Sequence, residues 1–234
     1  MRYTRQELKH DKFAETAAEA VHWTVEHRQK LIYAAIAAAV VLALLVGGLW
    51  YQSYRARQAS IALGDALTIY NAPIVPAGQA EPQITTFPTL QERANAAKKA
   101  LYEVESKYGS TAPGKYAGYL AAVCEQQLGN FKVAEERFKN AVNSGNEDTA
   151  ALAKFALAAV YRDTNRVAEA VNIYKQLIEK PASTVPKTVA QMGLADTYLA
   201  QQPEEAKKIY QQIVKDNPQT ATAEIAQAKL ASLP

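Results

Sequence analysis

The segments LAAVC (120–124), LAAVY (157–161) and LADTY (194–198) share one pattern: a large residue, a small residue and, three positions later, cysteine or tyrosine. The pattern recurs every 37 residues. Residues one, three or four positions apart share one face of an α-helix. Each copy is therefore predicted to be a helix, which we call helix A of a repeat unit.

A second pattern follows each copy and recurs every 36 residues. It consists of an alanine, an aromatic residue four positions later and a small or aliphatic residue three positions after that, which is again helical spacing. It predicts a helix B after each helix A, so that the chain is built of helical hairpins. The residues of this pattern are Ala134, Phe138, Ala141, Ala170, Tyr174, Leu177, Ala206, Tyr210 and Ile213.

Short turns separate these predicted helices. Most of them are rich in Gly, Pro, Asn and Ser, as expected where a chain reverses direction. The turns within hairpins are 128–130, 163–165 and 201–203, and those between hairpins are 144–148, 181–186 and 216–218.

The pattern continues in both directions. The segment 97–104 repeats helix B one unit earlier, and its helix A would contain the segment 63–67. A long loop with four prolines, 71–88, would join the two, and the segment 89–92 is a capping box that restarts a helix. At the other end, a lone helix at about 220–232 carries the large–small pair, and a single unpaired helix commonly caps such a stack.

The repeat resembles the tetratricopeptide repeat, a helix-turn-helix unit of about 34 residues. Its small residues let helices A and B approach closely, and its aromatic residue fills the space between successive hairpins. The resemblance implies an all-α fold, a tetratricopeptide-like solenoid of about four hairpins plus a C-terminal capping helix. The small contact residues would be Ala121, Ala158, Ala195, Ala134, Ala170 and Ala206.

The segment LIYAAIAAAVVLALLVGGLWY (31–51) has 21 residues and no charge. As a helix it would cover roughly 30 Å, the thickness of a bilayer core. We predict a single transmembrane helix at 31–51 within the lipid bilayer, an N-terminal cytoplasmic helical segment at 1–30 and a repeat domain at 52–234. The alternative is a cleaved signal peptide, but a long polar segment precedes the apolar run and no small-x-small cleavage site follows it.

The distribution of basic residues favours a cytoplasmic N-terminus. Six basic residues precede the apolar segment, whereas only Arg55 and Arg57 follow it before Arg93. The segment TRQE (4–7) fits a capping box, so the N-terminal segment is predicted to contain a helix. This helix either rests on the membrane surface or on a partner, or it is a solvated lead-in to the anchor.

The composition argues against catalysis, cofactors and nucleic acid. The net charge of +3 gives no strong attraction to nucleic acid. The segment 52–234 has no histidine and the chain has one cysteine, Cys124, so neither an intrachain disulfide nor a Cys/His zinc site is expected. Sequence motifs for phosphate loops, nucleophile elbows and metalloproteases are absent. We predict a protein that is not an enzyme and binds no cofactor or metal.

The N-terminal anchor, a helix leading out of it and a divergent repeat domain together resemble the ancillary Sec-translocon subunit family of bacteria. The resemblance implies a single-pass protein of the bacterial inner membrane with a periplasmic repeat domain. Its partners would be proteins: the Sec translocon, envelope chaperones and exported polypeptides. The expected function is a membrane-tethered protein-binding adaptor or holding chaperone. The alternative is a scaffold for an envelope or cell-wall assembly complex, which a groove with charges of one sign would favour.

The predicted binding surface is the inner face formed by the A helices. Counting from the large residue of each unit, positions two before and two, five and six after it point inward. The set mixes apolar residues with charges of both signs, and adaptable apolar residues suit a loose grip on extended chains. Phe155 and Met192 could instead serve only to pack against neighbouring helices. The predicted groove residues are Gly118, Ala122, Glu125, Gln126, Phe155, Ala159, Arg162, Asp163, Met192, Asp196, Leu199 and Ala200.

Overall fold

A computed structural model describes residues 16–17, 19–76 and 84–233. The chain divides into two compact units, Met1–Tyr54 and Arg55–Pro234, and each is considered by itself. The predicted capping box at 4–7 and the middle of the proline-rich loop lie outside the described residues.

The predicted all-α fold is confirmed. Within the described ranges, β pairing is confined to one isolated parallel bridge, between Ile74 and Phe87 in the proline-rich loop. The helices are α2 (Arg28–Tyr70), α3 (Leu90–Tyr108), α4 (Ala112–Gln127), α5 (Phe131–Val142), α6 (Glu147–Asp163), α7 (Val167–Glu179), α8 (Lys187–Tyr198), α9 (Pro203–Asp216) and α10 (Ala221–Ala231).

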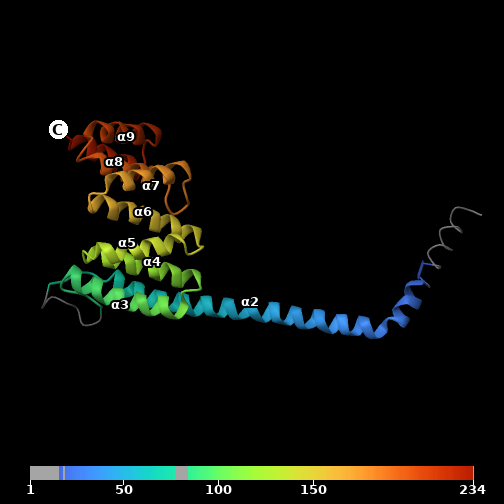
Figure 1. The fold of residues 1–234 in the computed structure, drawn as a ribbon. Helices are drawn as coiled ribbons and strands as arrows, with labels where there is room; N and C mark the ends of the chain where they lie inside the picture. Colours follow the sequence, from blue (N-terminus) through green and yellow to red (C-terminus); the bar gives the residue numbers. More distant parts are fainter. Residues whose placement is uncertain (1–15, 18, 77–83, 234) are drawn as a thin grey trace, which may run out of the picture. The chain divides into compact units, whose positions relative to one another are not determined.

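The helices of the second unit stack as successive hairpins (Figure 1). The C-terminal part of α2 packs on α3, and the following hairpins are α4 with α5, α6 with α7 and α8 with α9. Helix α10 packs on α9 and, more sparsely, on α8 without a hairpin partner, as predicted for the capping helix. The A helices after the first are therefore α4, α6 and α8, and the B helices are α3, α5, α7 and α9.

The predicted packing positions form the core. Each of four apolar clusters joins a hairpin to its neighbour, because side chains of one helix B also meet the next helix A. The aromatic residues Phe138, Tyr174 and Tyr210 of the B helices are completely buried. The six small contact residues are buried to the same extent: Ala121, Ala158, Ala195, Ala134, Ala170 and Ala206.

Local signals place the helix ends. The hydroxyl oxygen of Thr89 accepts a hydrogen bond from the backbone N–H of Glu92 at 3.1 Å, which satisfies one free donor at the start of α3. Gly129 and Asn165 follow α4 and α6 with φ of 78° and 61°. Glycine and asparagine are the residues that enter this left-handed region most readily, so the two equivalent turns have suitable residues.

Cys124 is a core residue. Its side chain is completely buried where sister units carry tyrosine. Burial, with a smaller contribution from the nearby Glu125 carboxylate, raises the pKa of the Cys124 thiol to about 11. A thiol in this environment stays protonated at neutral pH, which disfavours reactivity because the thiolate is the nucleophile.

An ion-pair cluster links the second and third hairpins. The guanidinium of Arg166 donates through both Nη atoms to the Glu135 carboxylate, and Lys139 Nζ donates to it at 2.6 Å. The hydrogen bonds from Arg166 are the main reason that the pKa of Glu135 falls to about 2. Arg166 also lies over the ring of Tyr161, 4.2 Å from its centroid. Bidentate pairing of this kind fixes orientation as well as charge.

The N-terminal part of α2 is exposed and apolar. Its most apolar 18-residue window has a mean hydropathy of 2.5, and none of that window is buried. The helix is thus long and apolar enough to cross a membrane. Before it, residues 19–26 are also helical, with the Trp23 ring stacked on His27 at 4.9 Å between centroids.

Candidate protein-binding groove

Successive A helices lie next to one another. The backbones of α4 and α6, of α6 and α8, and of α8 and α10 approach closely, whereas the described B helices meet one another only through side chains. We call the surface formed by α4, α6, α8 and α10 the A-helix face. Its hollow is a cavity of about 360 Å³, here called the A-helix groove, lined mainly by α6, α8 and α10.

The A-helix groove contains several of the predicted residues. Five of the twelve predicted groove residues line it: Phe155, Ala159, Arg162, Met192 and Asp196. They come from two successive A helices, and the 37-residue spacing places Phe155 with Met192 and Ala159 with Asp196 at equivalent positions. Whether these residues bind a partner stays a prediction.

The floor of the A-helix groove is apolar and tightly packed. The ring of Phe155 meets Tyr174 edge-on, with 5.4 Å between centroids and an interplanar angle of 71°. Gly193 allows this packing, since a Cβ added there would lie 2.4 Å from Tyr174 Cε1. Phe155 therefore packs against the next helices, as the alternative interpretation held, and it also remains partly exposed in the groove.

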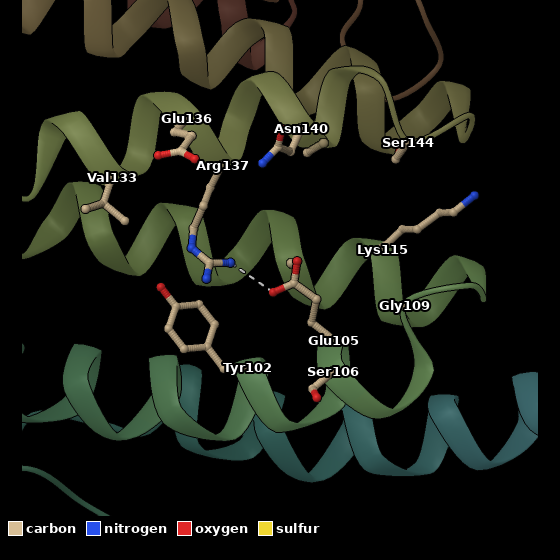
Figure 2. Close-up of a pocket in the computed structure, with 12 residues that line it drawn as sticks. Tyr102, Glu105, Ser106, Gly109, Lys115, Val133, Glu136, Arg137, Asn140 and Ser144 are labelled. Carbon is tan, nitrogen blue, oxygen red and sulfur yellow. Dashed lines mark hydrogen bonds and ion pairs between the residues drawn. The ribbon is translucent and has the colours of Figure 1, made fainter.

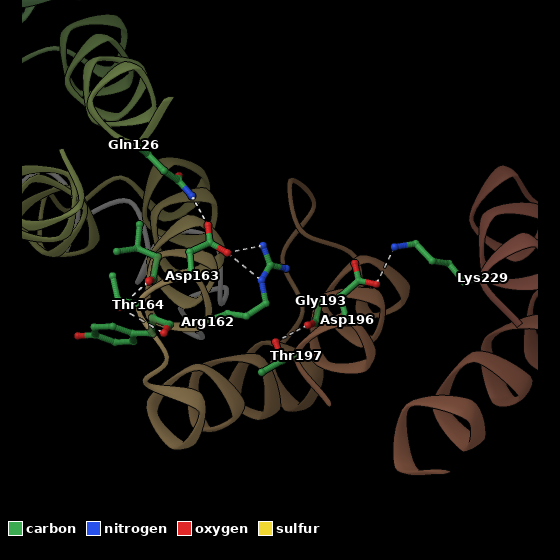
Figure 3. Close-up of polar contacts among 10 residues, drawn as sticks. Gln126, Arg162, Asp163, Thr164, Gly193, Asp196, Thr197 and Lys229 are labelled. Carbon is green, nitrogen blue, oxygen red and sulfur yellow. Dashed lines mark hydrogen bonds and ion pairs between the residues drawn. The ribbon is translucent and has the colours of Figure 1, made fainter. Parts of the chain in front are cut away.

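The rim carries charges that are already paired (Figure 3). Arg162 donates from Nε and Nη2 to Asp163 Oδ1, each at 3.0 Å, and Gln126 Nε2 donates to Asp163 Oδ2 at 3.4 Å. On the next A helix, Asp196 accepts a hydrogen bond from Lys229 Nζ of α10 at 3.2 Å. The rim thus has no net excess of one sign among these pairs.

Tyrosine hydroxyls beside the groove remain neutral. The Tyr210 hydroxyl donates to Asp196 Oδ1, and burial followed by this hydrogen bond raises the pKa of Tyr210. Burial likewise raises the pKa of Tyr174 to about 12. The groove therefore offers a surface whose rings do not change charge near neutral pH.

Glu125 is placed differently from Phe155 and Arg162. It is only 5% exposed and accepts hydrogen bonds from Tyr102, from Asn130 Nδ2 at 2.7 Å and from Lys98 Nζ at 3.4 Å. Burial alone would raise the pKa of Glu125, but these donors outweigh it and lower the pKa. Through these hydrogen bonds its carboxylate joins the first two hairpins, and Glu125 does not line the A-helix groove.

Six other predicted residues also lie outside the lining of the groove: Gly118, Ala122, Gln126, Asp163, Leu199 and Ala200. Gln126 and Asp163 form the polar rim just described, and Leu199 packs into the apolar cluster under α10. Conversely, sequence reasoning missed Thr222 and Ile225 of α10, which line the groove. Ile225 could have been predicted, because it is an apolar residue on a helix that has no hairpin partner. The sequence interpretation gave α10 the role of a cap alone.

This arrangement defines a class: helical-hairpin solenoids that present an A-helix groove. Within it, the chain belongs to the tetratricopeptide repeat-like domain family, whose sequence profile matches residues 22–234. Domains of this type are generally non-catalytic adaptors that bind other proteins. No curated protein sequence matches the chain significantly.

Two solved structures share the fold, and a third gives a lower score. A putative kinesin light chain from Podosopora anserina with nearly identical TPR-like repeats has 20% identity and a TM-score of 0.50, covering 60% of this chain and 78% of its own. A single-substitution variant of it gives 19% identity and a TM-score of 0.51 over the same shares. A tetratricopeptide repeat protein from Parabacteroides merdae has 17% identity and a TM-score of 0.45, covering 60% of this chain and 53% of its own.

Proposed function

We propose that this chain is a membrane-tethered adaptor or holding chaperone of the bacterial cell envelope, acting on newly exported proteins near the Sec translocon. The observation that supports this most is the A-helix groove, an apolar hollow of about 360 Å³ bordered by charges that are already paired. A groove for one charged tail would need unpaired charges of one sign. Paired charges and adaptable apolar side chains such as Met192 suit extended segments of varied sequence.

The proposed anchor is the apolar part of α2. Its exposed window matches the length and hydropathy of a bilayer-spanning helix. The excess of basic residues before it favours a cytoplasmic N-terminus and a periplasmic repeat domain in the inner membrane. A tether of this kind would raise the local concentration of the groove where exported chains emerge.

The topology has a direct test. Reporter fusions at the N-terminus and the C-terminus of the full chain should report opposite sides of the membrane, with the C-terminus outside. External protease should degrade the repeat domain in spheroplasts, because that domain lies on the outer side in this proposal. A repeat domain protected until the membrane is dissolved would contradict the orientation.

Site-specific crosslinking in cells tests the partner. A photo-crosslinking amino acid at Phe155 or Arg162 should capture translocon subunits, envelope chaperones or varied exported chains. The matched control position is Lys175, which is exposed on a B helix and lies outside the groove. Capture of a single cell-wall assembly protein from Phe155 would support the scaffold alternative instead, and equal capture from Lys175 would contradict binding in the groove.

A further inference from the structure

A larger hollow lies between two B helices, on a different surface from the A-helix groove. Figure 2 shows it between α3 and α5, with α4 behind. Its volume is about 840 Å³, and it shares no lining residue with the A-helix groove. We call it the B-helix groove. The equivalent space one hairpin later, between α5 and α7, measures only about 210 Å³.

Gly118 shapes the wall of the B-helix groove that α4 provides. The equivalent positions in the next two units carry the bulky residues Phe155 and Met192. Gly118 lines the hollow, and a Cβ added there would lie 2.5 Å from Glu105 Oε1. The glycine therefore lets the Glu105 side chain lie against α4, where a side chain at position 118 would displace it.

The charged side chains at the centre of the B-helix groove are already paired with each other. Arg137 Nη1 donates to Glu105 Oε2 at 2.9 Å, as Figure 2 shows. The Arg137 guanidinium also lies over the Tyr102 ring, 4.0 Å from its centroid. An arginine held by a carboxylate and an aromatic face at once forms a rigid floor. Neither of these two charges is free to select a ligand.

The two ends of the B-helix groove carry charges of opposite sign. Glu136 and Lys115 line it, and neither has an ion-pair partner within the part of the chain that the structure describes. Lys115 Nζ lies beside Gly145, 4.0 Å from the position of an added Cβ. Ser144, next to it, has a buried hydroxyl without a hydrogen-bond partner among the described residues.

The distance between the two ends follows from helix α5. Glu136, Asn140 and Ser144 are spaced four residues apart and all line the groove. At 1.5 Å per residue the helical part from Glu136 to Val142 covers about 9 Å, and two further residues beyond the end of α5 lead to Ser144, so the two ends are separated by roughly 12 Å. An extended chain rises about 3.3 Å per residue, so it covers this distance in about four residues. Side chains four positions apart in an extended chain point to the same face.

We propose that the B-helix groove binds an extended polypeptide segment of another protein that carries one basic and one acidic side chain four positions apart. The basic side chain pairs with Glu136 and the acidic one with Lys115. The backbone of the segment meets the exposed amide of Asn140. This site is independent of the A-helix groove and of the proposed function there.

The test uses the full chain in detergent and short fluorescent peptides in a Ser, Thr and Val background. One peptide has Lys and Glu four positions apart, and the other has Glu at both positions. By fluorescence anisotropy the wild-type chain should prefer the Lys/Glu peptide by about five- to tenfold. Glu136→Lys should reverse this order, because the groove then presents two basic groups.

Two further variants distinguish binding in the B-helix groove from a general change in charge or folding. Glu169→Lys changes an exposed glutamate of α7 outside the groove and should leave the peptide preference unchanged. Asn140→Trp fills the groove from an exposed position and should abolish binding of both peptides while circular dichroism stays the same. The same order of affinities in wild type and Glu136→Lys would overturn the proposal, as would a wild-type chain that binds neither peptide.

Discussion

Replacing Gly114 by alanine should destabilise the repeat domain by about 3 kcal/mol, at the upper end of the usual effect of overpacking. Gly114 lies in the first turn of α4, and an added Cβ would stand 2.0 Å from the carbonyl oxygen of Tyr108. That carbonyl cannot move away easily, because it accepts hydrogen bonds from the backbone N–H of Thr111 at 2.8 Å and from its hydroxyl at 2.7 Å. The clash therefore distorts the turn between α3 and α4, which joins the first hairpin to the second.

The matched control for Gly114→Ala is Gly64→Ala. Gly64 lies in the interior of α2, is exposed and has no atom within 4 Å of an added Cβ. Alanine should stabilise this helix by about 0.5 to 1 kcal/mol, because glycine loses more backbone freedom on folding. Urea unfolding of the full chain followed by circular dichroism measures both effects. A Gly114→Ala chain as stable as the wild type would mean that the corner between α3 and α4 is not packed as described.

Tryptophan at Ala158 or at Ala170 should also destabilise the domain, by about 1 to 3 kcal/mol for each substitution. Both alanines are completely buried in the cluster that joins α6, α7 and α8. Each occupies a place where two helices approach closely, so a large ring can fit only if the helices separate. Breaking one hairpin also uncovers its neighbours, since stability in a repeat stack depends on contacts between adjacent units.

Lys175→Trp provides the control for these tryptophan variants. Lys175 is exposed on α7, between the buried residues Tyr174 and Leu177, so a ring there can remain at the surface. Its urea midpoint should stay close to that of the wild-type chain. Equal stability of all three tryptophan variants would show that the repeat frame is wrong.

The frame of the repeat could be predicted from sequence because it depends on spacing alone. A buried alanine every 36 residues and a buried large–small pair every 37 are requirements of close helix packing. The six small contact residues and the three aromatic residues of the B helices are buried as predicted. Helix ends were also predictable where one side chain determines them, as Thr89 does for α3.

The binding surface was only partly predictable. The counting rule located the residues of α6 and α8, because neighbouring A helices repeat the same positions. It could not show that Glu125 is buried, since that depends on Tyr102, Lys98 and Asn130, which come from outside its own helix. The same rule did not predict the B-helix groove, because that hollow is lined by side chains of three helices from two hairpins.

The measurement that tests the central claim most directly compares two exposed isoleucines. Ile225 is 53% exposed and lines the A-helix groove, whereas Ile61 is 58% exposed on α2 and lies outside it. The full chain in detergent is titrated against a fluorescent polypeptide kept unfolded by reduction and carboxymethylation. We expect Ile225→Asp to weaken binding about tenfold by removing an apolar contact, and Ile61→Asp to leave the dissociation constant unchanged. Equal affinity of the two variants and the wild type would contradict the claim that the A-helix groove holds extended polypeptide.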